Sequence, residues 1–211
     1  MSDEPKKPAR KKAAPKAEGP KATAPKAPRR DANRPREAVL AAARPHAALD
    51  GFTDAVLQKA GTEARVSDVA RLFENGPISL IEFYSSWADE RMEARLAATD
   101  LKAMKIRERI ATAVKARLAV LKPQKEAARR AGALLSLPMH AALGAKLLYR
   151  TVDAMWRAAG DTSTDFNFYT KRGILAGVYS ATLVRWFNDT AEDDSVTREF
   201  LAARIENVMQ F

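Results

Sequence analysis

The chain has 211 residues, no cysteine and a formal net charge of +10. The lack of cysteine excludes disulfides and thiolate metal sites, and no apolar run reaches the ~18 residues of a membrane-spanning helix. The charge is unevenly distributed: residues 1–36 hold 12 Lys/Arg against 4 Asp/Glu, or +8, and the remainder holds 24 against 22, or +2. We therefore expect one main domain with a basic tail, whose body does not have the clustered basic face of a DNA-binding protein.

Residues 1–33 consist mainly of Lys, Pro and Ala, with almost no large apolar side chain. Such a segment buries too little surface to offset the entropy lost on ordering, so we predict disorder. The tail is either a solubilising leader without a specific partner, or a segment that contacts anionic lipid or nucleic acid through charge alone.

Short helices are predicted at the start of the body. Residues 36–43 carry apolar side chains on one face, and Pro45 is expected to end or bend this helix. A second short helix follows Thr53, and a third covers residues 67–74. Pro77 then opens a long, apolar helix. We expect residues 34–84 to form a helix-turn-helix-like subdomain and residues 85–211 to form a second helical domain.

The middle of the chain contains a regular core stripe and then its most apolar segment. Ile106, Ile110, Val114, Leu118 and Leu121 recur at helical spacing, and breaks are expected at the two prolines that follow, Pro123 and Pro138. In residues 131–149 the only fixed charge is Lys146. This segment can be a buried pair of helices. Alternatively, it is the wall of a cavity for an apolar ligand, or a surface that contacts a bilayer.

The next predicted helix begins near Asp165 and ends near residue 187, and a last helix covers residues 195–209. Asp165, Phe168, Tyr169 and Arg172 are spaced at i, i+3, i+4 and i+7, so they share one side. An aromatic pair between an acid and an arginine is typical of interface hot spots, whereas the alternative is that both rings are core. No strand pattern is present, so the fold class is all-α, with about nine helices.

No catalytic constellation is found in the sequence. His46 and His140 are far apart and neither has metal-ligand spacing. Asp161 and Asp165 are accounted for by turn and cap chemistry, and no other catalytic group lies near them. We expect no catalytic residue, no metal and no cofactor, and therefore a protein that is not an enzyme.

Several motifs together resemble a known family. They are Met155-Trp156, Ala159-Gly160-Asp161, Ser163-Thr164-Asp165-Phe166-Asn167, Tyr169-Thr170-Lys171-Arg172, His46, Asp50-Gly51-Phe52-Thr53, Phe73, Gly76-Pro77, Arg107-Glu108-Arg109-Ile110, Leu137-Pro138 and His140. This set is similar to the signature of a ubiquinone-biosynthesis accessory family, the ninth of the Coq series. The likeness covers roughly residues 36–211.

The resemblance implies a TetR-like fold that is usually dimeric, an apolar pocket for isoprenoid quinone precursors or phospholipid, and docking onto the demethoxyubiquinone hydroxylase. It maps partner binding onto Asp165, Phe168, Tyr169 and Arg172. It further implies a position at the cytoplasmic face of a membrane. For the lipid we expect contacts from Leu134, Leu137, Leu143, Leu147, Leu148, Met155, Trp156, Val178 and Leu183.

Two departures from the family pattern stand out. Family members carry Trp where this sequence has Phe168, which keeps an aromatic ring but not the indole N–H. Mitochondrial members continue into an amphipathic, membrane-binding helix that residues 1–211 do not include. Membrane contact is therefore expected from residues 131–149 or from the basic tail.

A TetR-like transcription regulator is the competing hypothesis, because residues 36–84 have the three-helix arrangement that begins such repressors. The helix expected to enter the major groove, residues 67–74, contains one basic and two acidic side chains. A surface that faces phosphates is usually richer in Lys and Arg, so we do not expect nucleic acid as a partner.

Overall fold

The computed structural model describes residues 30–162 and 166–209. Within these ranges the chain is helical and contains no strand, which confirms the all-α prediction. The elements are α1 (Arg30–Asp50), α2 (Asp54–Glu63), α3 (Val69–Leu72), α4 (Pro77–Ala97), α5 (Ile106–Leu121), η1 (Lys122–Gln124), α6 (Lys125–Leu135), η2 (Pro138–His140), α7 (Ala141–Ala158), α8 (Phe166–Phe187) and α9 (Ser195–Met209).

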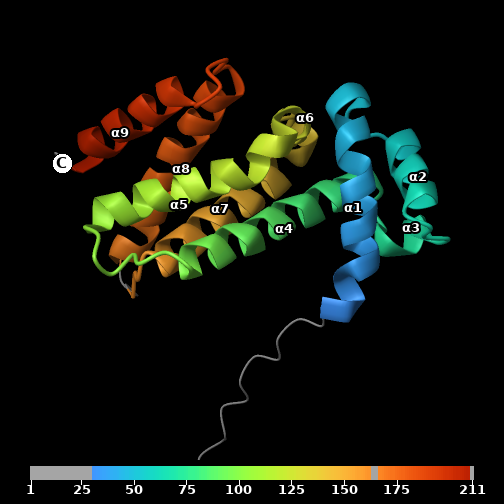
Figure 1. Ribbon diagram of the computed structural model, residues 1–211, viewed down its shortest axis with the longest axis horizontal. Coiled ribbons are helices and arrows are strands. Elements are labelled where there is room, and N and C mark those ends of the chain that lie inside the picture. The colour runs from blue at the N-terminus through green and yellow to red at the C-terminus, as the bar shows by residue number, and fades with distance from the viewer. Residues whose placement is uncertain (1–29, 163–165, 210–211) are drawn as a thin grey trace, which may run out of the picture.

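Helices α1, α2 and α3 lie together at one end of the molecule (Figure 1). Thr53 caps α2 by accepting a hydrogen bond from the Val56 backbone N–H at 3.2 Å. Gly61 permits the close approach of α2 and α3, because a Cβ at this position would lie 2.0 Å from Val69 Cγ2. Gly76 has φ +58°, which suits glycine in the turn before Pro77 opens α4.

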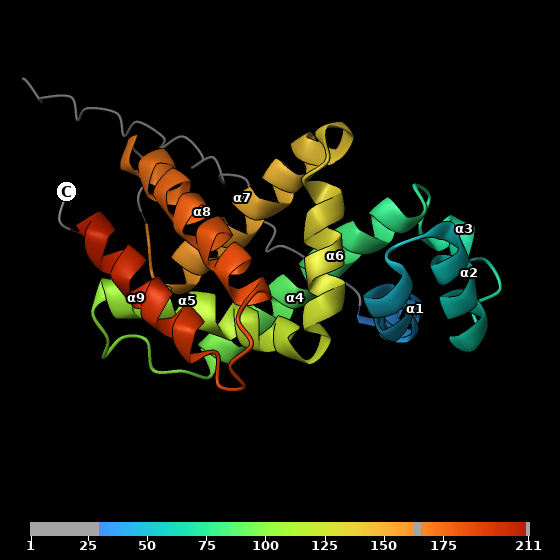
Figure 2. The same ribbon diagram turned by 90° about the horizontal axis from the view of Figure 1, so that it is seen from above.

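Helices α4, α5 and α7 form the centre of the larger part, and α8 and α9 lie at the end opposite α1–α3 (Figure 1). Helix α6 lies between α1 and the central helices (Figure 2), and it contacts both α1 and α7. One continuous hydrophobic cluster runs through these elements. Its largest fully buried side chains include Trp186, Phe73, Met92 and Met155.

Helix α1 differs from the prediction at both ends. It contains both Pro35 and Pro45, so of the two outcomes expected at Pro45, an end of the helix is excluded. It begins at Arg30, inside the segment predicted to be disordered; residues 1–29 of that segment lie outside the described residues. Helix α4 covers positions 84 and 85, where the two helical parts are expected to meet, and the division into two parts stays a prediction. By contrast, chain breaks occur at Pro123 and Pro138 as predicted.

Among the described residues, no single helix has both the length and the apolar character needed to cross a membrane. One bent pair, covering Ile106–Leu135 and Pro138–Ala158 with 91° between its halves, meets the criteria of length and composition together.

Candidate ligand cavity and partner surface

A cavity of about 570 Å³ lies between helices α4, α5, α6, α7 and α8. Its wall is mostly apolar, because the helices present aliphatic and small side chains to one another there. The main apolar lining residues are Ile81, Leu121, Leu135, Leu147, Leu148, Leu183, Val184 and Phe187. Gly132 and Gly144 also line it, and at Gly144 a Cβ would lie 2.9 Å from the Leu135 carbonyl oxygen, so α6 and α7 approach closely.

Polar side chains from four helices also line this cavity: Tyr84 and Ser85 from α4, Arg117 from α5, Thr151 from α7 and Tyr179 from α8. Asp89 is buried beside them and accepts a hydrogen bond from Thr151 Oγ1 at 2.8 Å.

Arg117 and Asp89 form a buried ion pair in this group. Arg117 Nη1 lies 3.4 Å from Asp89 Oδ1, and the two side chains are 5% and 9% exposed. Arg117 Nη2 donates to Ser85 Oγ at 3.4 Å. Because a buried charge without a partner is strongly unfavourable, each side chain offsets part of the cost of burying the other.

Both tyrosines of the cavity are held in their protonated form. Burial raises the pKa of Tyr84 to about 12, although the nearby Arg44 and Arg117 oppose the shift. Burial also raises the pKa of Tyr179, again against the effect of Arg117. At neutral pH each therefore presents a hydroxyl that can donate a hydrogen bond.

The residues expected to bind lipid are divided among several locations. Leu147, Leu148 and Leu183 line the main cavity. Trp156 and Val178 line a second cavity of about 500 Å³ between α5, α7, α8 and α9. The remaining four are not among the lining residues of either cavity: Met155 is fully buried in the core, Leu134 packs against it, Leu143 is half-buried and Leu137 is exposed.

The aromatic pair of the expected partner surface lies at the start of α8. Tyr169 is 67% exposed, and Phe168 is half-buried. The two rings meet edge to face, with centroids 5.1 Å apart. Asp165, the fourth residue of the expected set, lies outside the described residues.

Arg172 is expected on the same exposed side of the helix as the two rings, but its side chain is only 3% exposed. Its Nε donates to Asp153 Oδ1 at 2.7 Å, and its Nη1 donates to Asp161 Oδ2 at 3.1 Å. The same Nη1 donates to the Phe168 carbonyl oxygen at 3.1 Å, and the guanidinium lies over the Phe168 ring at 3.4 Å. Arg172 therefore supports the aromatic pair from beneath instead of forming part of the exposed surface.

Sequence reasoning missed the buried polar group around Arg117 and Asp89. A signal was present: Arg117 lies three residues after Val114 and four before Leu121, so it occupies the apolar stripe of α5. Asp89 likewise lies three residues before Met92 on the buried face of α4. A charged side chain on a core stripe indicates a buried partner, because such residues are rarely buried unless paired.

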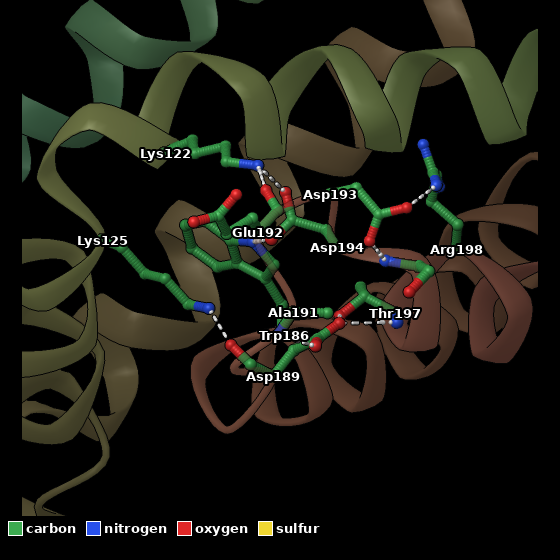
Figure 3. Close-up of polar contacts among 11 residues, drawn as sticks. Lys122, Lys125, Trp186, Asp189, Ala191, Glu192, Asp193, Asp194, Thr197 and Arg198 are labelled. Carbon is green, nitrogen blue, oxygen red and sulfur yellow. Dashed lines mark hydrogen bonds and ion pairs between the residues drawn. The ribbon is translucent and has the colours of Figure 1, made fainter.

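Polar contacts hold the loop between α8 and α9 against η1 and the start of α6 (Figure 3). Lys122 Nζ donates to Asp194 Oδ2 at 2.7 Å, and Lys125 Nζ donates to the Asp189 carbonyl oxygen at 2.6 Å. Asp189 Oδ2 accepts from Thr197 Oγ1 at 2.6 Å and from the Thr197 backbone N–H at 2.8 Å. These contacts hold the end of α8, which borders the main cavity.

Across the residues that the structure describes, no group of three or more His, Cys, Asp or Glu side chains is arranged to hold a metal ion.

The fold places the chain among proteins with the architecture of TetR regulators. A solved TetR transcriptional regulator from Nitrosomonas europaea matches it with a TM-score of 0.68, covering 83% of this chain and 98% of that chain at 23% sequence identity. At this identity the likeness establishes the fold alone.

Sequence comparison finds one family that part of the chain resembles. Residues 141–211 match the COQ9 family. The mitochondrial ubiquinone biosynthesis protein COQ9 of Rattus norvegicus is 43% identical over 97 residues, which cover 46% of this chain and 31% of the rat protein. The human protein is 41% identical over 97 residues, which cover 46% of this chain and 30% of the human protein. The Drosophila melanogaster protein is 28% identical over 180 residues, which cover 83% of this chain and 55% of the fly protein.

The carboxy-terminal third of the chain therefore matches the COQ9 family, and the resemblance predicted from the sequence is confirmed. The matched segment spans about a third of the length of the rat and human relatives.

Proposed function

We propose that this chain is a lipid-binding accessory protein of ubiquinone biosynthesis. It holds an isoprenoid quinone precursor or a phospholipid and presents it to the demethoxyubiquinone hydroxylase, without catalysing a reaction itself. The observation that carries the proposal is the mostly apolar cavity of about 570 Å³ in a chain whose carboxy-terminal third matches the COQ9 family. Its volume falls within the range of roughly 300–1,000 Å³ that is usual for small-ligand sites.

The proposal is tested by native mass spectrometry and solvent extraction of the purified chain. We expect a bound isoprenoid or phospholipid that extraction removes. Gly132→Phe, which places a ring in the cavity wall, should reduce the bound lipid at least several-fold. Ala145→Phe, at an exposed position of α7, is the matched control and should bind as the unchanged protein does. A chain that remains empty when offered prenylated lipid would contradict the proposal.

We propose Phe168 and Tyr169 as the hydroxylase-binding surface. An exposed tyrosine beside a half-buried phenylalanine supplies aromatic area at low entropic cost, as interface anchors do. Arg172 contributes by fixing the Phe168 ring and backbone, and Asp165 stays a prediction.

We also propose that the chain forms a homodimer through α8 and α9, as TetR-like proteins usually do. The support is an exposed strip along α8 with little side-chain bulk, formed by Gly173, Ile174, Gly177, Ala181 and Val184. Nothing among the described residues lies within 4 Å of a Cβ built at Gly173 or Gly177, so a second helix has room to approach there.

Contact with the cytoplasmic face of a membrane is proposed for the corner between α6 and α7. Met139 is 79% exposed and Leu137 is 43% exposed in this corner, next to Leu135 and Ser136 of the cavity wall. A lipid that leaves a bilayer there would have a short path to the cavity.

A DNA-binding regulator is the second candidate, because the structural neighbour from Nitrosomonas europaea is described as a transcriptional regulator. Helix α3 has a single turn, with Arg71 between Asp68 and Glu74. Sequence-specific, salt-sensitive DNA binding by the chain in a gel-shift assay would favour this candidate over lipid binding.

A further inference from the structure

The polar part of the main cavity holds buried atoms that have no hydrogen-bond partner among the residues that the structure describes: the donors Tyr84 Oη, Arg117 Nε and Arg117 Nη1, and the acceptor Asp89 Oδ2. Arg117 Nη1 lies in the ion pair with Asp89 Oδ1 at 3.4 Å, so Tyr84 Oη and Arg117 Nε are the donors that remain to be satisfied. Tyr84 is 3% exposed and Arg117 is 4% exposed, and both line the cavity. Buried donors are normally satisfied, so these groups indicate an acceptor supplied from outside the chain.

Arg117 already has a buried negative partner, which makes a second negative group directly beside it less favourable, although Arg44 is a further cation near Tyr84. Arg117 is already opposed by Asp89, whose Oδ1 lies 3.4 Å away. Asp89 also has Arg150 Nε at 3.6 Å from its Oδ2, but the Arg150 side chain is 38% exposed and screened by solvent. A carboxylate or phosphate placed beside Arg117 would therefore face the buried Asp89 carboxylate in a medium that screens charge poorly.

We infer that this end of the cavity binds the head group of an amphiphile whose head is a neutral oxygen acceptor, such as a ketone, quinone or ester carbonyl. The oxygen takes hydrogen bonds from Tyr84 and Arg117, and the apolar chain lies along the wall formed by Leu147, Leu148 and Leu183. The inference rests on the proposed lipid binding and adds to it the orientation of the ligand and selection against anionic heads.

Three ligands with a common farnesyl chain test the inference: farnesylacetone, which is a ketone, farnesene, which has no polar head, and farnesoic acid, which is an anion. Each displaces Nile red from the full chain, and displacement gives its affinity. We expect farnesylacetone to bind at least about tenfold more tightly than either other ligand, since a hydrogen bond to a charged donor has an effect of this size.

Two variants and a matched control locate the effect. Tyr84→Phe removes a hydroxyl that has no partner among the described residues, so it should reduce the preference for the ketone over the hydrocarbon several-fold while leaving farnesene binding unchanged. Tyr149→Phe, at an exposed tyrosine of α7, is the matched control and should leave all three affinities unchanged. Asp89→Asn removes the opposing charge, so a folded variant should bind farnesoic acid better.

The outcomes separate the two proposals. Equal affinity for all three ligands, or preference for farnesoic acid in the unchanged protein, would overturn the head-group inference and leave lipid binding intact. An unchanged ketone preference in Tyr84→Phe would overturn the role of Tyr84. Failure of every ligand to displace or replace Nile red would contradict lipid binding itself.

Discussion

Arg172 illustrates how one side chain joins the interior of the protein to its surface. Its guanidinium binds Asp153 of α7 and Asp161 of the loop that follows α7, and it also lies against the Phe168 ring. Breaking a buried ion pair by removing one partner leaves the other charge uncompensated, which commonly costs ~3–5 kcal/mol. The position of Phe168 is therefore coupled to the stability of the fold.

Replacement of Arg172 tests this coupling. Arg172→Met should lower the free energy of unfolding by about 3 kcal/mol, because Lys171 and Arg157 still partly compensate the two carboxylates. The melting temperature should fall by roughly 6–12 °C for a domain of this size. Arg185→Met, at an exposed arginine of the same helix, should change stability by less than about 0.5 kcal/mol. Equal melting temperatures of the two variants would contradict the structural role of Arg172.

Tyr169 tests the partner surface separately from stability. Because its side chain is 67% exposed, Tyr169→Ala should leave the melting temperature nearly unchanged. Loss of one aromatic anchor should weaken hydroxylase binding by about 2 kcal/mol, or roughly 30-fold in dissociation constant. Surface plasmon resonance measures the change, with Tyr149→Ala as the matched exposed tyrosine. Unchanged binding of Tyr169→Ala would place the docking surface elsewhere.

At the scale of elements, the loop between α8 and α9 depends on an ionised Asp189. Hydrogen bonds from Thr197 hold the pKa of this carboxyl below its usual value. A carboxyl whose pKa is lower in the folded state contributes stability above its unfolded-state pKa, about 3.9, and this contribution is lost as pH falls through the folded-state pKa.

The consequence is a specific sensitivity to acid below about pH 4. In urea unfolding between about pH 4 and pH 3, Asp189→Asn should lose less stability with falling pH than the unchanged protein. An equal loss of stability with falling pH in both proteins would show that Asp189 does not cause the acid sensitivity.

Gly177 of α8 separates the stability of one protomer from dimer formation. A Cβ at this position meets nothing within 4 Å, and glycine is a poor helix former, so Gly177→Gln should stabilise the protomer by about 0.5 kcal/mol. In a dimer paired through α8, the added side chain would separate the two helices. Analytical ultracentrifugation should therefore find a lower dimer fraction for this variant, and an undiminished fraction would exclude pairing through this strip.

At the scale of the whole molecule, the periodic parts of the fold could be predicted from the sequence. The stripe from Ile106 to Leu121 became α5, and Pro123 and Pro138 introduce breaks as expected. Pro45, where the sequence predicts an end or a bend, does not end α1, and Val39, Leu40, Ala43 and Ala47 on the same helix are fully buried. Their packing outweighs the hydrogen bond that proline removes.

The candidate site could be predicted only in part. Spacing along one helix puts Phe168, Tyr169 and Arg172 on one side, but the burial of Arg172 depends on Asp153 and Asp161, which precede α8 in the chain. The cavity is formed by residues from five helices that are far apart in sequence. Composition offered a cavity wall as one of the alternatives for residues 131–149, several of which line the cavity, but it could not place Leu143 or Met155 relative to it.

A crystal structure of the chain purified with prenylated lipid tests the central claim most directly. The account predicts density for an apolar chain within the cavity between α4 and α8, in contact with Leu147, Leu148 and Leu183. Lipid bound only at the protein surface, with helices α4 to α8 closed over an unfilled interior, would contradict it.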